Sequence, residues 1–203
     1  MTRLYITRHG ETIWNTQKRM QGHLDSELTD TGRRQAQQLS RVLEEIELDA
    51  IYSSSSGRTL QTAQIIAGKR NIPVIPMDSL REMGLGEWEG QVFTEVQKNY
   101  PEQYKNFWEA PHLYKPVGGE EFTDVRNRIF DTLQSVISCH EGGNIMLVTH
   151  AISLKTIMMI VENKELKELW GGGFVHPASL SVIEYDDGQW NVIKRGDISH
   201  YEE

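Results

Sequence analysis

The hydrophobic pattern of the chain changes period several times, and the first change follows a short strand. Apolar and polar residues alternate over residues 3–7, where Leu4 and Ile6 share one face, and this period of two predicts a strand. The polar, aperiodic stretch over residues 10–28 predicts a long loop, a type of segment that often carries function. A helix is expected next, because capping residues precede an apolar stripe that comprises Ala36, Leu39, Leu43 and Ile46.

A second strand, loop and helix follow the first. Residues 50–53 predict a short strand, and Arg58 opens a helix after a serine-rich loop. Residues 73–76 can form only a brief edge strand, because proline cannot donate a hydrogen bond to a neighbouring strand. A long amphipathic helix is then expected from an apolar stripe of Phe122, Val125, Ile129, Leu133 and Val136.

The last third of the chain predicts the centre and one edge of a sheet. Residues 145–148 are apolar on both faces, as in a central parallel strand, which stops at Thr149-His150 before a helix over residues 151–161. Residues 179–185 and 190–194 flank an Asp-Gly pair that suits a tight hairpin turn, so an antiparallel pair is expected. The pattern predicts an α/β fold: a three-layer sandwich with a mostly parallel sheet, an antiparallel edge and helices on both faces.

Aromatic residues are dense between residues 87 and 119, where the helical period is weak. One interpretation is a small helical insertion that uses the aromatic side chains as its own core. The other is a lid over a site. The length of the chain suits one domain, so residues 1–203 are expected to form a single domain with this helical insertion at about residues 87–119.

Charge and composition narrow the class of protein. The 203 residues carry 21 Lys or Arg against 29 Asp or Glu, a net charge of −8, which is the wrong sign for general attraction to nucleic acid or an anionic membrane. A lone Cys139 excludes an internal disulfide framework and a cysteine-rich zinc site, and the longest apolar run, residues 157–161, cannot span a membrane. We expect a cytoplasmic protein without nucleic-acid or membrane partners, of unknown oligomeric state.

Cationic and imidazole side chains stand where the predicted strands end. Arg8 and His9 follow the first strand, Arg58 comes shortly after the second, and His150 follows the central one. Because ligands bind outside the carboxyl ends of the strands in an open parallel sheet, we expect these side chains to converge there. The helix that starts at Ala151 would direct its free N–H groups at the same place. Such a site suits a phosphoryl group, since buried cations repel one another unless an anion binds.

Four ordered segments carry a specific pattern. They are LYITRHGET at residues 4–12 with LTDTG at 28–32; YSS at 52–54 with Arg58; LRE at 80–82 with WEG at 88–90; and VTH at 148–150. Together they resemble the histidine phosphatase superfamily, the Arg-His-Gly group that includes the phosphoglycerate mutases. The resemblance covers most of the chain. Ala151 and Glu27 depart from it, since many relatives have Gly and Pro there, and Glu120-Glu121 stands where relatives often have Glu-Ser.

The resemblance implies catalytic roles for individual residues. His9 would attack phosphorus as a neutral imidazole and form a phosphohistidine. Arg8, Arg58 and His150 would bind the phosphoryl oxygens and neutralise the charge of the transition state. Glu82 would protonate the leaving alkoxide and then accept a proton from the attacking water.

The resemblance also implies contacts to substrate beyond these catalytic groups. Asn15 and Gln21, in the predicted loop, resemble residues that hydrogen-bond the phosphoryl oxygens or the substrate. Apart from the resemblance, His23 lies near the expected rim of the site and is a further candidate for contact with the substrate. The other histidines show no metal-ligand spacing, and neither a metal nor a cofactor is expected.

The most direct interpretation is a metal-independent phosphomonoester hydrolase that acts on small phosphorylated molecules through a phosphohistidine, with broad specificity as one expectation. Residues 83–90, MGLGEWEG, resemble the phosphatase branch, whereas mutases have a tyrosine- and glycine-rich stretch that ends in Asn-Lys. The aromatic insertion favours apolar or aromatic leaving groups. Two alternatives stay open: a phosphoglycerate mutase, and a catalytically silent protein that binds a phosphorylated ligand.

Overall fold

Six strands form one mixed sheet in the computed structural model, which describes residues 1–202. The strand order is β3-β2-β4-β1-β5-β6; the first four strands are parallel, while β5 and β6 run antiparallel to their neighbours. The predicted α/β fold with a mostly parallel sheet and an antiparallel edge is confirmed. The strands are β1 (Thr2–Arg8), β2 (Ala50–Ser54), β3 (Val74–Met77), β4 (Asn144–Thr149), β5 (Leu180–Asp186) and β6 (Gln189–Asp197).

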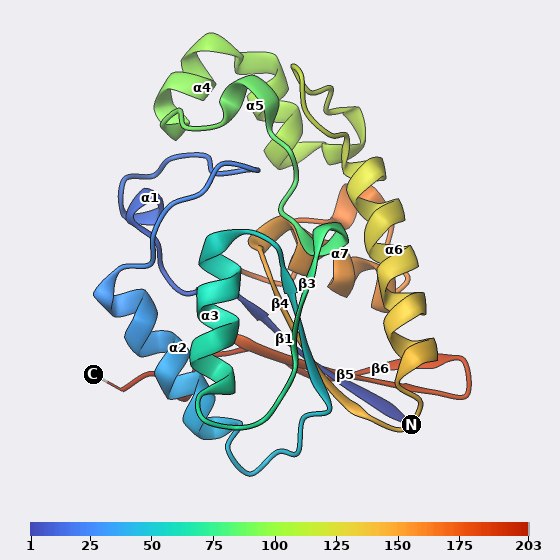
Figure 1. Ribbon diagram of the computed structural model, residues 1–203. Coiled ribbons are helices and arrows are strands. Elements are labelled where there is room, and N and C mark those ends of the chain that lie inside the picture. Colours follow the sequence, from blue (N-terminus) through green and yellow to red (C-terminus); the bar gives the residue numbers. More distant parts are fainter. Residues whose placement is uncertain (203) are drawn as a thin grey trace.

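Helices cover both faces of the sheet (Figure 1). α2 (Asp30–Val42) and α3 (Gly57–Ala67) lie on one face, and α6 (Phe122–Cys139) and α7 (Ala151–Val161) lie on the other. The alternation along β1 places Leu4 and Ile6 in the core beneath α6 and α7, while Tyr5 packs in the core beneath α2 and α3. Each fully buried leucine or isoleucine contributes roughly 1.5–3 kcal/mol to folding, so these two cores hold the layers together.

Two local differences from the sequence pattern have simple physical causes. The segment predicted as a loop contains a one-turn helix, α1 (Ile13–Thr16), because the Thr12 side chain accepts the N–H of Asn15 and caps it. α2 ends at Val42, so the predicted apolar stripe runs past the end of the helix; Ile46 lies in the following turn, half-buried against the same core.

Between β3 and α6 the chain forms a small helical layer above the carboxyl edge of the sheet (Figure 1). The ring of Trp88 is fully buried there, and the centroids of four neighbouring aromatic rings lie 5.3–6.3 Å from its own. Its aromatic side chains thus pack against one another. That this layer closes as a lid stays a prediction. Its elements are η1 (Asp78–Leu80), η2 (Gly86–Trp88), α4 (Phe93–Asn99), α5 (Pro101–Glu109) and η3 (Pro111–Leu113); a further 3₁₀ turn, η4 (Leu166–Glu168), follows α7.

Over residues 1–202, we find no helix with the length and apolar character that crossing a bilayer requires.

Candidate active site

Parallel pairing of β1 with β4 brings the two predicted histidines together. The register places Arg8 opposite Thr149, so the next residues, His9 and His150, leave the sheet side by side. Their ring centroids lie 5.3 Å apart, and both side chains are buried. The backbone N–H of His9 also donates to the carbonyl of Thr149 at 2.9 Å. Two residues far apart in sequence therefore share one site at the carboxyl edge of the sheet.

Hydrogen bonds assign the proton of each imidazole. Nδ1 of His9 lies 2.7 Å from the carbonyl oxygen of Gly10, which can only accept, so Nδ1 carries the hydrogen and Nε2 has a free lone pair in the neutral ring. Nδ1 of His150 lies 3.0 Å from Nη2 of Arg58, which can only donate. His150 thus carries its hydrogen on Nε2, which lies 2.8 Å from Oγ of Ser54.

Both imidazoles are neutral at physiological pH. Burial lowers the pKa of His9 well below its usual value of 6.5, and the charges of Arg58 and Arg8 lower it further. Burial also lowers the pKa of His150 well below 6.5, with Arg58, His9 and Arg8 acting in the same direction. The unprotonated Nε2 of His9 is therefore available near neutral pH without an added base.

The guanidinium of Arg58 fastens the loop after α1 to the histidine pair. Nη1 donates to the carbonyl of Leu24 at 2.7 Å and to Oδ1 of Asp25 at 2.9 Å, while Nη2 donates to the carbonyl of Gly22 at 2.9 Å and to His150. Burial lowers the pKa of Arg58, and its bond and charge contact with Asp25 oppose that shift. The cation is thus held in one orientation inside the protein.

Arg8 places a second guanidinium beside the histidines. Its Nη1 donates to the carbonyl of Val175 at 2.8 Å, and burial lowers its pKa to about 10 despite the attraction of Glu82. The Nε atoms of Arg8 and Arg58 are buried, and neither has a hydrogen-bond partner among residues 1–202. Buried donors in proteins are nearly always paired, and an anion bound in the cavity that both residues line would supply acceptors.

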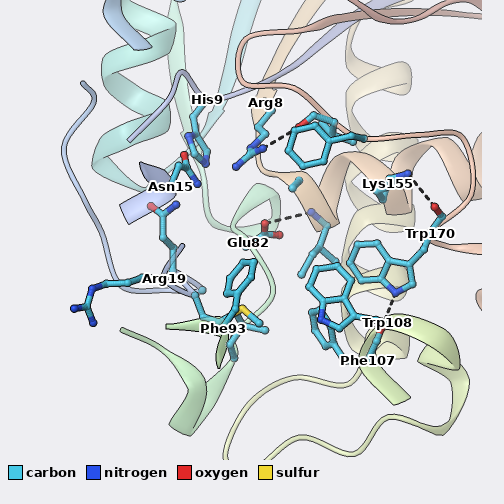
Figure 2. A pocket seen from close by; sticks show the side chains of 18 of the residues that line it. Arg8, His9, Asn15, Arg19, Glu82, Phe93, Phe107, Trp108, Lys155 and Trp170 are labelled. Carbon is cyan, nitrogen blue, oxygen red and sulfur yellow. Dashed lines mark hydrogen bonds between the residues drawn. The ribbon is translucent and has the colours of Figure 1, made fainter. Parts of the chain in front are cut away.

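The carboxyl group of Glu82 lies between Arg8 and the aromatic side chains of the pocket (Figure 2). It is 8% exposed, and its oxygens accept the backbone N–H groups of Met83 at 3.1 Å, Ile152 at 3.2 Å and Ser153 at 3.3 Å. The expectation that the first N–H groups of α7 face the phosphoryl site is thus wrong for Ile152 and Ser153. A carboxylate at a helix N-terminus satisfies unpaired N–H groups, and here Glu82 takes that place.

Asn15 and Gln21 present amide groups near the same cavity. Oδ1 of Asn15 accepts the backbone N–H of Thr12 at 3.0 Å, and Oγ1 of Thr12 lies 3.0 Å from that oxygen and 3.2 Å from Oε1 of Gln21. Both amide oxygens are therefore occupied, which leaves the NH₂ groups to face a ligand. His23 does not line the cavity; its Nε2 lies 3.0 Å from the backbone carbonyl of Glu82.

A cavity of about 400 Å³ extends from His9 toward the helical layer, while His150, fully buried beside His9, is not among the residues that line it. Figure 2 shows Phe93, Phe107, Trp108 and Trp170 on the side away from His9 and Arg8, with Glu82 between the two parts. Phe174 differs from them, because its ring centroid lies 6.0 Å from the guanidinium carbon of Arg8. The cavity is mixed: cationic and polar at one end, apolar at the other. The aromatic lining residues are Phe93, Phe107, Trp108, Trp170 and Phe174.

Sequence reasoning missed the segment that follows α7. Trp170 and Phe174 line the cavity, and the intervening glycines carry backbone carbonyls that accept hydrogen bonds from the Nζ of the buried Lys155. Burial lowers the pKa of Lys155. The run of three glycines, residues 171–173, was the available hint, because such runs let a backbone approach another group closely.

Within residues 1–202, no three His, Cys, Asp or Glu side chains lie where they could hold a metal ion together.

An α/β sandwich that presents two neutral histidines, two buried guanidiniums and a carboxyl group at the carboxyl edge of its sheet is typical of enzymes that handle phosphoryl groups. The family model described as "Histidine phosphatase superfamily (branch 1)" matches residues 4–198. The chain belongs to this superfamily, and it is a phosphatase.

Three similar proteins illustrate the relationship. Phosphoserine phosphatase 1 of Hydrogenobacter thermophilus is 34% identical over 96% of this chain and 92% of its own. Phosphoglycerate mutase-like protein 4 of Arabidopsis thaliana is 36% identical over 98% of this chain and 87% of its own. The solved structure titled "Bacillus stearothermophilus YhfR" superposes with a TM-score of 0.96 at 46% identity, and the match covers 98% of this chain and 99% of that one.

Proposed function

We propose that this protein is a metal-independent phosphomonoester hydrolase that works through a phosphohistidine at His9. The hydrogen bond from Nδ1 of His9 to the Gly10 carbonyl is the observation that supports this most directly. It leaves Nε2 unprotonated in a cavity that Arg8 and Arg58 also line, and the Nε–H groups of these arginines have no partner among residues 1–202. A nucleophile and the donors for the group that it attacks are thus present together.

The proposed reaction has two displacements. Nε2 of His9 attacks phosphorus and forms a P–N bond while the P–O bond to the leaving group breaks, and the carboxyl proton of Glu82 passes to the leaving oxygen. A water molecule then attacks the phosphohistidine. Glu82 takes the proton of that water, the P–N bond breaks, and inorganic phosphate and neutral His9 are released.

Fixed donors stabilise the charge that moves in both steps. We assign Arg8 and Arg58 to the equatorial phosphoryl oxygens, with the amide groups of Asn15 and Gln21 as further donors. We assign His150 to the same oxygens on the condition that its Nε2–H exchanges the contact with Oγ of Ser54 for the phosphoryl group. The two guanidiniums supply the positive charge that metal ions supply at many other phosphoryl-transfer sites. Since their partners hold them in place before substrate arrives, little reorganisation is needed during the reaction.

The apolar end of the cavity suggests the substrate class. Phosphoryl chemistry takes place at the cationic end, so the leaving group would lie among the aromatic side chains (Figure 2). We propose small phosphomonoesters with apolar or aromatic leaving groups, accepted with broad specificity because contacts of this kind are not strongly directional. We propose that neither a nucleic acid nor a membrane is a partner of this protein.

The cationic side chains that line the cavity favour hydrolysis over mutase activity. A mutase must retain a bisphosphorylated intermediate, which requires a second anion site. Beyond Arg8 and Arg58, the cationic residues that line the cavity are Arg19 and Lys155. Arg19 donates to the Gly90 carbonyl at 2.6 Å and to Oε1 of Gln17 at 2.9 Å, and Lys155 donates to backbone carbonyls. The guanidinium of Arg19 points away from the cavity (Figure 2), and Lys155 is bound to the backbone, so we propose that neither holds a second phosphate.

A panel of phosphomonoesters assayed in the presence of a chelator tests this function, with His9→Ala as the blank. We expect turnover of aryl phosphates in excess of 3-phosphoglycerate, and an acid-labile phosphoryl label on His9 after a rapid quench. Strong preference for 3-phosphoglycerate would favour the mutase instead. Absence of both turnover and label would leave only the ligand-binding alternative.

A further inference from the structure

An arginine outside the cavity grips the backbone that carries Glu82. Arg128 lies on α6 and is not among the residues that line the cavity. Its Nη1 donates to the carbonyl of Ser79 at 2.8 Å and to that of Arg81 at 2.8 Å, and its Nη2 donates to the carbonyl of Glu82 at 3.1 Å. One side chain thus contacts three of the four carbonyls from residue 79 to residue 82.

Glu120 completes the hydrogen bonding of this guanidinium. Nε of Arg128 donates to Oε1 of Glu120 at 2.9 Å, and Nη2 donates to Oε2 at 3.1 Å. The same Oε2 accepts the backbone N–H of Gly84 at 2.6 Å. Burial raises the pKa of Glu120, but the bonds from Arg128 and Gly84 outweigh it and the net shift is downward, so the carboxylate stays charged. Arg128 and Glu120 therefore hold the chain on both sides of Glu82.

All five N–H groups of Arg128 are matched by five acceptor contacts: three carbonyl oxygens and two carboxylate oxygens. Lysine could not reproduce this arrangement, because its ammonium has three donors and no fixed plane. Removing a guanidinium largely from water costs free energy, which these five contacts offset. So complete a set of contacts is expected where the position of a neighbouring group, here Glu82, matters for function.

The backbone around Glu82 has little regular structure of its own. It lies between the 3₁₀ turns η1 and η2, outside the sheet. A general acid must reach hydrogen-bond distance of the leaving oxygen, and a displacement of about 1 Å can cost two orders of magnitude in rate. The carbonyl of Glu82 also lies 3.0 Å from Nε2 of His23, which links it to the loop that Arg58 fastens.

We propose that Arg128, oriented by Glu120, is a positioning residue that holds the general acid Glu82 toward the leaving-group oxygen. The inference rests on the proposed function, because it requires Glu82 to protonate the leaving group. It adds Arg128 and Glu120, which do not line the cavity, to the residues that the reaction depends on.

Leaving groups of different basicity separate this role from a purely structural one. Phenyl phosphate and 4-nitrophenyl phosphate have similar shapes, but phenolate needs protonation as it leaves much more than 4-nitrophenolate does. We expect Arg128→Gln to lower kcat/KM for phenyl phosphate by about tenfold to a hundredfold, part of the 10²–10⁴ that a general acid typically supplies. For 4-nitrophenyl phosphate we expect less than about a threefold loss. Because kcat/KM covers only the steps to the first product, hydrolysis of the phosphohistidine does not obscure the comparison.

Two variants calibrate this ratio. Arg126→Gln is the matched control, since Arg126 lies on the same helix with an exposed side chain, and it should leave the ratio unchanged. Arg128→Lys should give an intermediate ratio. A folded Arg128→Gln protein with the wild-type ratio would overturn the inference. If that variant does not fold, Glu120→Gln replaces it, with a smaller change in the same direction expected and an unchanged ratio counting against the inference.

Glu82→Gln distinguishes this inference from the proposed function. It should change the ratio more than any other variant. If Glu82→Gln changes the ratio and Arg128→Gln does not, only the positioning role of Arg128 is contradicted. If the wild-type protein hydrolyses neither ester, the proposed hydrolysis is contradicted. If Glu82→Gln leaves the ratio unchanged, the assignment of Glu82 as the general acid is contradicted.

Discussion

Oδ1 of Asp25 lies 2.9 Å from Nη1 of Arg58, and the arginine in turn donates to Nδ1 of His150 at 3.0 Å. Asp25 is 44% exposed, whereas Arg58 is almost completely buried, so this ion pair joins a partly exposed carboxylate to a buried cation in the site. The carboxylate of Asp25 is thus one of the groups that orient Arg58, together with the carbonyls of Gly22 and Leu24, and Arg58 in turn sets the tautomer of His150.

Asp25→Asn should therefore weaken both catalysis and the fold. Loss of the carboxylate charge leaves Arg58 buried with fewer compensating contacts, which costs about 1–3 kcal/mol of stability. We expect kcat/KM for an aryl phosphate to fall about tenfold, mostly through KM, because the guanidinium is no longer fixed for the phosphoryl oxygens. Steady-state kinetics with thermal unfolding check this. Asp30→Asn, at an exposed ion pair with Arg33 on α2, should change neither quantity appreciably.

The histidine pair should resist protonation. Since burial and the two guanidiniums lower the pKa of both His9 and His150 well below 6.5, their imidazole Cε1–H resonances should not move between pH 7.5 and 5.5. A histidine in a short reference peptide titrates within this range. Proton NMR of the ligand-free protein, with His9→Gln and His150→Gln used for assignment, makes the measurement. A midpoint near pH 6.5 for either ring would contradict the burial argument.

The same shifts predict how stability depends on pH. Below about pH 6.5 the unfolded chain protonates both histidines while the folded protein does not, so the unfolded state binds more protons and stability falls as the pH is lowered. Each histidine contributes a slope of up to about 1.4 kcal/mol per pH unit in that range. Urea unfolding at several pH values gives the slope. The double variant His9→Gln, His150→Gln should be less sensitive to pH, and an equal slope would show that other groups are responsible.

Leaving-group selectivity should depend on the aromatic side chains that line the cavity. Phe174 lines it and is 71% exposed, and its ring centroid lies 6.0 Å from the guanidinium carbon of Arg8, so it borders the cationic end. Phe174→Ala should raise KM for 1-naphthyl phosphate about tenfold, the scale of losing part of a hydrophobic contact, and should change KM for glycerol 2-phosphate little. The control is Phe130→Ala, which removes an exposed phenylalanine from α6 outside the cavity. Equal losses on both substrates would place Phe174 outside the leaving-group site.

Activity should fall in alkaline solution if Glu82 must carry a proton in the first displacement. The dependence of kcat/KM for phenyl phosphate on pH measures this, and we expect an optimum at or below neutrality. A rate that still rises above about pH 9 would argue against Glu82 as the acid.

Local patterns predicted most of the elements because periodicity depends only on neighbouring residues. Residues 145–148 are apolar on both faces, and the strand that they form is indeed buried between β2 and β1. The Asp-Gly pair predicted a hairpin, and Asp187 and Gly188 adopt the positive φ values that its turn requires. The end of α2 was missed, because an apolar stripe continues wherever burial continues, whether or not the backbone stays helical.

The sequence by itself determined the strands, the long helices that cover the sheet and the residues at the strand ends, among them Arg8, His9 and His150. Only the tertiary structure decided which nitrogen of each imidazole is protonated, that the first N–H groups of α7 bind Glu82, and that Arg128 supports that residue from behind. The physical reason is that hydrophobic periodicity reports the burial of one residue at a time. Hydrogen-bond partners are chosen by packing between segments that lie far apart along the chain.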